Sequence, residues 1–246
     1  MRFLLLFAFA LLSFGSAEGG VLRIAAAANL NQVLPALLSA YHISHPKTML
    51  IVSYGSSGSL SQQIARGAPY HVFLSASPRY IEYLDSKGLL SDSKPFAEGR
   101  LVLYLKSAFA ERPPEVHRLL KSDVKRIVIA NPEFAPYGVA AISCMKHSGI
   151  YQHVAGKLIY ADNVSQAAQM TLVAADAAFL ALPLASSEAL QKRGTFTVLG
   201  DDCHQPLLQI AAITKEGQSQ SARAFLAFLG SKTAIRIISN YGYGIP

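Results

Sequence analysis

Residues 21–41 read VLRIAAAANLNQVLPALLSAY, and they carry the clearest secondary-structure pattern in the chain. Residues 21–28 first alternate and then consist of small apolar residues, a pattern that is typical of a buried parallel strand. The apolar residues that follow, from Leu30 to Tyr41, recur at helical spacing. Pro35 belongs in the first turn of a helix, so we expect the helix to begin near Asn31. The stretch therefore predicts a buried strand that runs directly into a helix.

The same unit of a strand followed by a helix recurs along the rest of the chain. Such alternation indicates parallel-type sheets flanked by helices on both faces, which places the protein in the α/β class. Gly and Pro residues mark most boundaries between the units. Further strands are predicted at 49–54, 72–75, 101–105, 126–130, 158–160, 177–182 and 207–213, and further helices at 59–66, 78–88, 138–149, 164–173, 183–194, 222–229 and 234–241.

Two lobes are expected because the chain is long for one domain and comfortable for two. No flexible linker separates two halves of the sequence, so strands must join the lobes. We expect the chain to cross to the second lobe near Arg100 and to return near Pro206. Lobe I then comprises residues 18–100 and 207–246, lobe II comprises residues 101–206, and a cleft lies between them.

The N-terminus has the pattern of a secretory signal peptide. Arg2 precedes the apolar residues 3–12, and small and polar residues follow. The apolar stretch is shorter than the roughly 20 residues that a transmembrane helix needs, and no cysteine follows it, so a lipoprotein is not expected. We predict a signal peptide at residues 1–17, cleavage after Ala17 and a periplasmic location.

The composition indicates a globular protein with a basic surface. The chain has 51% hydrophobic and 15% charged residues, and its formal net charge is +7. The Lys and Arg residues are scattered and form no run or stripe, so a nucleic-acid partner is not predicted. The positive charge would attract anions weakly. We expect a monomer.

Four turns between a strand and a helix have the composition of an anion site. They read AAAN at 26–29, GSSG at 55–58, APYG at 135–138 and DNVS at 162–165, and each predicted lobe supplies two. Ligands in open α/β sheets bind beyond the carboxyl ends of the strands. Helix N-termini there present free backbone N–H groups and a positive dipole end. The four turns together predict a small anion held between the lobes, although each turn alone is better explained by ordinary helix capping.

The polar side chains of these turns are largely neutral donors, since no Lys or Arg lies inside them. Ser56, Ser57 and Asn29 can add hydroxyl or amide groups to the backbone N–H groups. A site made only of donors disfavours hydrogen phosphate, whose proton needs an acceptor. Asp162 is expected to face solvent or to cap the following helix, because a carboxylate pointing into the cleft would favour phosphate.

Short motifs in a characteristic order span nearly the whole chain after the signal peptide. They are residues 25–34, YGSSGSL at 54–60 with QI at 63–64, GAP at 67–69, VFLSA at 72–76, NPE at 131–133, APYG at 135–138, NVSQA at 163–167 and FLAL at 179–182. Together they resemble the periplasmic molybdate-binding proteins (ModA-like substrate-binding proteins). The resemblance implies a two-lobed periplasmic-binding-protein fold of type II, with a hinge of two crossing strands. It also implies a receptor that needs no cofactor and delivers molybdate or tungstate to the membrane permease of an ABC importer.

The resemblance also implies which residues bind the oxyanion. Ser57 would bind it through its hydroxyl and its N–H group, and Tyr137 and Val164 would contribute backbone N–H groups. Asn29 stands where one branch of the family has a binding serine, so its side-chain amide or its backbone would take that role. Ala181 stands where the same branch has a tyrosine whose hydroxyl touches the ligand, so this sequence lacks that donor.

Other function classes have weaker support. Ser57 lies in GSSGS, which lacks the final glycine of a nucleophile elbow, so no enzymatic activity and no catalytic residue are predicted. His42 and His45 are expected at the outer end of a helix, and the DDCH cluster at 201–204 is expected in a solvated loop, so no metal cation is predicted. A receptor for another oxyanion such as sulfate, or for a small organic anion, is the alternative.

Cys144 and Cys203 are the two cysteines of the chain. They could form a disulfide in an oxidising compartment, and their spacing has no metal signature. Each is equally compatible with a small buried apolar residue. The sequence alone leaves the pairing open.

Overall fold

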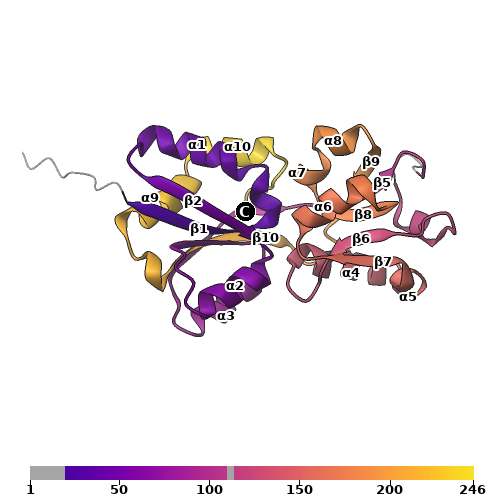
Figure 1. The fold of residues 1–246 in the computed structure, drawn as a ribbon, viewed down its shortest axis with the longest axis horizontal. Coiled ribbons are helices and arrows are strands. Elements are labelled where there is room, and N and C mark those ends of the chain that lie inside the picture. The colour runs from indigo at the N-terminus through magenta and orange to yellow at the C-terminus, as the bar shows by residue number, and fades with distance from the viewer. Residues whose placement is uncertain (1–19, 110–113) are drawn as a thin grey trace, which may run out of the picture.

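The computed structural model describes residues 20–109 and 114–246, and it consists of two lobes side by side (Figure 1). The predicted signal peptide at residues 1–17 lies outside the described residues. Each lobe is built on one five-stranded sheet with helices on both faces. Within the described residues, no helix is both long enough and apolar enough to cross a membrane.

Lobe I is the body around the first sheet. This sheet contains, in spatial order, β2 (Met49–Gly55), β1 (Val21–Ala27), β3 (Val72–Ser75), β10 (Leu207–Thr214) and β4 (Leu90–Gly99). β1, β2 and β3 are parallel, whereas β10 is antiparallel to both of its neighbours. The helical elements are η1 (Ala28–Asn31), α1 (Leu34–Ser44), α2 (Ser57–Ala65), α3 (Pro78–Asp85), η4 (Lys215–Gly217), α9 (Gln220–Leu229) and α10 (Lys232–Asn240).

The helices of lobe I cover both faces of its sheet, with α1, α9 and α10 on one face and α2 and α3 on the other (Figure 1). Neighbouring residues of β1 therefore lie in different cores. Ala25 packs with Leu60 and Phe73, whereas Ile24 and Ala26 belong to the larger core. This two-sided burial explains why the end of β1 is continuously apolar instead of alternating.

Lobe II is the body around the second sheet. This sheet contains, in spatial order, β7 (Leu158–Ala161), β6 (Ile127–Ala130), β8 (Ala177–Ala181), β5 (Leu101–Lys106) and β9 (Gly194–Val198). β7, β6 and β8 are parallel, and β5 is antiparallel to β8 and β9. The helical elements are η2 (Val116–Leu120), α4 (Pro136–His147), α5 (Tyr151–Val154), η3 (Ala155–Lys157), α6 (Val164–Val173), α7 (Leu182–Ala185) and α8 (Glu188–Gln191).

The chain passes between the two sheets twice. It leaves lobe I where β4 ends at Gly99, and β5 begins in lobe II at Leu101. It returns through residues 199–206 into β10, whose first residue, Leu207, pairs with Gly99. The two connections therefore run next to each other, as a two-strand hinge requires.

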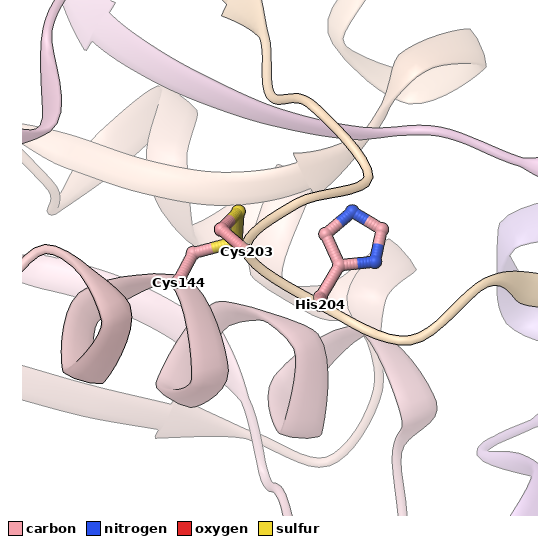
Figure 2. A group of neighbouring side chains, drawn as sticks. All are labelled: Cys144, Cys203 and His204. Carbon is pink, nitrogen blue, oxygen red and sulfur yellow. A yellow bond between two sulfur atoms is a disulfide. The ribbon is translucent and has the colours of Figure 1, made fainter.

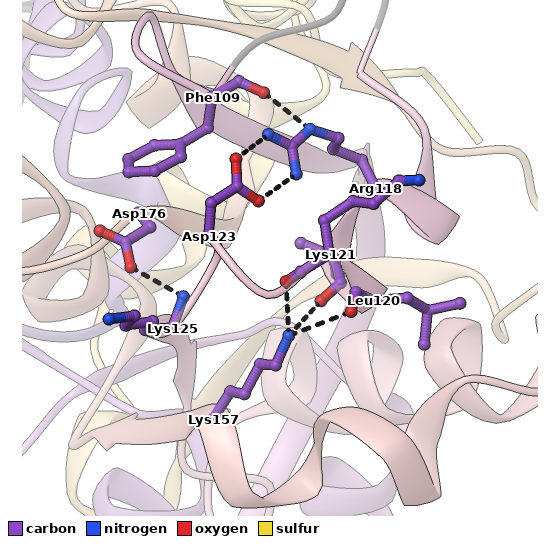
Figure 3. A network of polar contacts seen from close by, with 9 residues as sticks. Phe109, Arg118, Leu120, Lys121, Asp123, Lys125, Lys157 and Asp176 are labelled. Carbon is purple, nitrogen blue, oxygen red and sulfur yellow. Dashed lines mark hydrogen bonds and ion pairs between the residues drawn. The ribbon is translucent and has the colours of Figure 1, made fainter.

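Polar contacts hold the segment that leads into β6 (Figure 3). Arg118 donates to both carboxylate oxygens of Asp123, at 2.8 and 2.6 Å, and these bonds lower the pKa of Asp123 to about 2. Lys157 donates to the carbonyl oxygens of Leu119 and Lys121 at 2.8 and 2.9 Å. The Asp176 carboxylate accepts from the backbone N–H of Lys125 at 3.0 Å. These contacts fix the route of the chain within lobe II.

Candidate functional site

A small cavity lies between the lobes, and the four turns singled out in the sequence supply nearly all of its wall. Its volume is about 10 Å³. The lobes are in contact beside it through two hydrogen bonds. The Gly58 N–H donates to the Phe134 carbonyl at 2.8 Å, and the Asn31 side-chain amide donates to the Ser165 hydroxyl at 2.6 Å. Every lining residue is uncharged. The lining residues are Ala27, Ala28, Asn29, Gly55, Ser56, Ser57, Ala76, Ala135, Pro136, Tyr137, Asn163 and Val164.

The N-termini of four helical elements, η1, α2, α4 and α6, meet at this cavity. The residues that precede these elements, Ala27, Ser56, Ala135 and Asn163, all line it. The first N–H groups of a helix have no acceptor within the helix, and the helix dipole makes this end positive. Two elements come from each lobe, so the cavity wall offers N–H donors from both sides. This arrangement suits a small anion.

The two serines of the GSSG turn have different tasks. The Ser56 hydroxyl caps α2, since it accepts from the Ser59 N–H at 3.3 Å and donates to the Ser59 hydroxyl at 2.7 Å. The Ser57 oxygen accepts from the Ala76 N–H at 3.0 Å, which leaves the hydroxyl proton of Ser57 available for a ligand. Ser57 is 1% exposed. The geometry therefore favours Ser57 over Ser56 as the side-chain donor.

The side chain of Asn29 is occupied within the protein. Its amide nitrogen donates to Gln209 Oε1 at 2.9 Å and to the Tyr243 hydroxyl at 3.1 Å, and this hydroxyl donates back to the Asn29 carbonyl at 2.8 Å. An Asn amide nitrogen has two donor hydrogens, and both are used by these partners. Of the two roles predicted for Asn29, only a backbone N–H donor is compatible with these bonds. Gln209 and Tyr243 hold this turn in place, and no sequence signal had pointed to them.

The backbone of Tyr137 lies at the cavity, and its ring points toward Gly99, where the chain crosses between the lobes. Its N–H group lies in the first turn of α4, which begins at Pro136. Its hydroxyl fills the space that a Cβ on Gly99 would occupy, and it has no hydrogen-bond partner among the described residues. Burial, reinforced by the neighbouring Tyr243, raises the pKa of Tyr137, so its hydroxyl stays neutral.

The DNVS turn places its carboxylate away from the cavity. Val164 is the first residue of α6 and lines the cavity, and the Asn163 side chain caps the helix by accepting from the Gln166 N–H at 3.0 Å. Asp162 is exposed and is not a lining residue. No carboxylate therefore belongs to the cavity wall.

The remaining candidates lie elsewhere. Ala181 is fully buried at the end of β8 and does not line the cavity. The ring of His45 stacks on Tyr41 with centroids 4.1 Å apart, while His42 is exposed on α1. Cys144 and Cys203 form a disulfide, which answers the question that the sequence left open.

Comparisons with known proteins agree with this geometry. The family model of the bacterial extracellular solute-binding proteins matches residues 22–244. This chain belongs to that family. A relative in it, the molybdate-binding protein ModA of Rhodobacter capsulatus, is 34% identical over 196 residues, which are 78% of this chain and 75% of that protein. The resemblance predicted from the sequence is confirmed.

The solved structures of family members and of more distant proteins show the same fold. The periplasmic molybdate-binding protein of Azotobacter vinelandii superposes with a TM-score of 0.84 at 29% identity, over 92% of this chain and 99% of that one. The sulfate-binding protein SubI of Mycobacterium tuberculosis has a TM-score of 0.72 at 16% identity, over 91% of this chain and 86% of that one, which shows the fold alone. The predicted two-lobed α/β class is confirmed, with sheets that are mixed instead of wholly parallel.

Proposed function

We propose that this protein is a periplasmic receptor that captures molybdate or tungstate between its lobes and delivers it to the permease of an ABC importer. The observation that carries the proposal is the uncharged cavity at which four helix N-termini from opposing lobes meet. Relatives named for molybdate binding support the choice of anion. No catalytic step, cofactor or nucleic acid is part of this function.

Four residues are proposed to bind the oxyanion directly. The backbone N–H groups of Asn29, Ser57, Tyr137 and Val164 and the Ser57 hydroxyl would donate to its oxygens. Hydrogen bonds to an ionised acceptor are roughly twice as strong as neutral ones, so several converging donors can replace the hydration of a dianion. Two bodies would close over the anion, namely residues 18–100 with 207–246 and residues 101–206.

The wall of the cavity also supports the proposed selectivity. It offers donors and no carboxylate, so the proton of hydrogen phosphate would stay without an acceptor, at a cost of about 1–3 kcal/mol. Molybdate, tungstate and sulfate carry no proton at neutral pH. At about 10 Å³ the cavity holds no more than about one water, so the lobes would have to move apart to admit an oxyanion, and an extended organic anion would require a larger movement.

Calorimetric titration of the mature protein with molybdate, tungstate, sulfate and phosphate tests the function. We expect tight one-to-one binding of molybdate and tungstate, weaker binding of sulfate and no measurable binding of phosphate. Sulfate binding as tight as molybdate binding would replace the proposed ligand by sulfate. Absence of binding to all four anions would refute an oxyanion receptor altogether.

Replacement of Ser57 by alanine should weaken molybdate binding by about 10- to 100-fold. The variant loses a hydroxyl that donates to a charged acceptor, an interaction worth about 1.5–3 kcal/mol. It also leaves the buried Ala76 N–H without its acceptor, so the free energy of unfolding should fall by about 1–3 kcal/mol. Titration calorimetry and chemical unfolding of the ligand-free variant measure the two effects.

Ser56→Ala is the matched control for that variant. The Ser56 hydroxyl caps α2 and is hydrogen-bonded to Ser59. We therefore expect the variant to lose about 1 kcal/mol in free energy of unfolding and to keep a nearly unchanged affinity for molybdate. Equal losses of affinity in the Ser56 and Ser57 variants would show that the GSSG turn acts only as a structural element.

Replacement of Tyr243 by phenylalanine should weaken molybdate binding although Tyr243 does not line the cavity. The variant removes both hydrogen bonds between this hydroxyl and Asn29, so the Asn29 N–H is held less firmly at the anion. We expect an affinity loss of about 3- to 10-fold, which corresponds to about 1 kcal/mol. Tyr241→Phe, a change on a partly exposed ring two residues away, should leave the affinity unchanged. A similar loss in both variants would contradict this positioning role.

A further inference from the structure

A second group of ligand-type side chains lies away from the anion cavity. Cys144 on α4 and Cys203 and His204 in the return connection come together (Figure 2), and one ligand atom from each lies within 4.8 Å of the others. Cys144 and His204 are buried, and Cys203 is half-buried. None of the three lines the anion cavity. The arrangement is therefore independent of the proposed function.

The ring of His204 has a hydrogen-bond acceptor at its Nε2 atom. Its Nδ1 lies 2.7 Å from the Gln205 carbonyl oxygen, and a carbonyl can only accept, so Nδ1 carries the hydrogen and donates it. In the neutral ring Nε2 then holds a free lone pair. Nε2 is buried and has no hydrogen-bond partner among the described residues, and the whole residue is 6% exposed. A buried polar atom without a partner is costly and calls for an explanation.

The same hydrogen-bond pattern is characteristic of histidines that bind metal ions. A metal-bound His usually donates its other ring N–H to a backbone carbonyl or a carboxylate, which fixes the ring and leaves the ligating nitrogen unprotonated. Two cysteine sulfurs and one imidazole nitrogen are the ligands that Zn²⁺ and other thiophilic cations prefer. Around tetrahedral Zn²⁺, two sulfurs lie about 3.7 Å apart, so small side-chain rotations would bring the three donors into place.

We propose that the reduced form of this protein binds a thiophilic metal ion, with Zn²⁺ as the reference cation, through Cys144, Cys203 and His204 Nε2. A dithiol reductant breaks the Cys144–Cys203 bond by thiol–disulfide exchange; it supplies two electrons and two protons and itself becomes a disulfide. Zn²⁺ then displaces the two thiol protons and binds both thiolates. Water supplies the fourth ligand, from the surface cavity of about 460 Å³ that Cys203 and His204 border.

Metal titration of the mature protein in both redox states tests the site. Co²⁺ is the probe, because tetrahedral Co²⁺–thiolate sites absorb in the visible and near-ultraviolet, and Zn²⁺ is then added to displace it. The protein is reduced with a phosphine, which contains no competing thiol. We expect the reduced protein to bind one equivalent of Co²⁺ with thiolate charge-transfer bands, and the oxidised protein to show none.

His204→Asn isolates the third ligand and keeps both cysteines. We expect this variant to bind at least about tenfold more weakly, as loss of a ligating group requires, whereas His153→Asn, a change at an exposed histidine of α5, should bind like the parent. The proposal is overturned if the reduced protein shows no thiolate–metal bands, or if His204→Asn binds as tightly as the parent. It is also overturned if the reduced protein is unfolded by circular dichroism at 25 °C, since only the fold brings these residues together.

Discussion

Gly58→Ala should weaken molybdate binding by about 5- to 100-fold, with a much smaller effect on the stability of the ligand-free protein. A Cβ at position 58 would lie 2.8 Å from the backbone of Phe134 in the other lobe and 2.9 Å from the Tyr80 hydroxyl. It would also strain the bond from the Gly58 N–H to the Phe134 carbonyl. Such overpacking costs about 1–3 kcal/mol. The clash with the Phe134 backbone arises only when the lobes touch, whereas the Tyr80 hydroxyl is the end of a side chain in the same lobe and can shift.

Titration calorimetry gives the affinity, and small-angle scattering with and without molybdate shows whether the lobes still close. Gly156→Ala is the matched control, because a Cβ there meets no other atom within 4 Å, and it should bind like the parent. An unchanged affinity for Gly58→Ala would show that the lobes can shift without loss of the site. A large fall in the stability of the ligand-free protein would place the strain within lobe I instead.

The parts of the fold that the sequence predicted are those with strong local patterns. The strand at Val21–Ala27 and the helix at Val164–Val173 were visible from their apolar periodicity. Two edge strands were missed. β4 contains Pro95 and several charged and polar residues and pairs irregularly with β10, and β9 is only half-buried. Both segments form strands because they pair with a neighbouring strand. A local sequence pattern does not predict such pairing.

Helix starts were less accurate, and the errors bear on the site. Sequence spacing placed the first helix near Asn31, whereas a 3-10 turn comes first and α1 begins at Leu34. The helix expected from residue 59 begins at Ser57. Proline and polar residues at helix N-termini satisfy several registers equally well, so the residues that present free N–H groups depend on the packed structure.

The roles of side chains at the site depended on distant partners. All four predicted residues, Asn29, Ser57, Tyr137 and Val164, do line one cavity. The side-chain amide of Asn29, however, is hydrogen-bonded to Gln209 and Tyr243, which are 180 and 214 residues away from it in the sequence. Local sequence predicts which turns meet, because strand ends share an edge of the sheet, but it does not predict which donors remain free.

Loss of the disulfide should lower the free energy of unfolding by about 4 kcal/mol. Cys144 and Cys203 are separated by 59 residues, and the chain-entropy relation gives a value of this size for a loop of that length. The bond also ties α4, which begins at the anion cavity, to the connection that returns to β10. For a protein of this length the melting temperature should fall by about 10 °C.

Guanidinium unfolding with and without a phosphine reductant measures this loss, and EDTA keeps metal ions from stabilising the reduced state. The variant with both Cys144→Ala and Cys203→Ala is the control, because its stability should match that of the reduced parent and should not respond to the reductant. A difference below about 1 kcal/mol between the two redox states would mean that the reduced chain keeps the same loop closed by packing alone. In that case the disulfide would add little to the contacts that α4 and the return connection already make, such as the Ser143 hydroxyl donating to the Cys203 carbonyl at 2.7 Å.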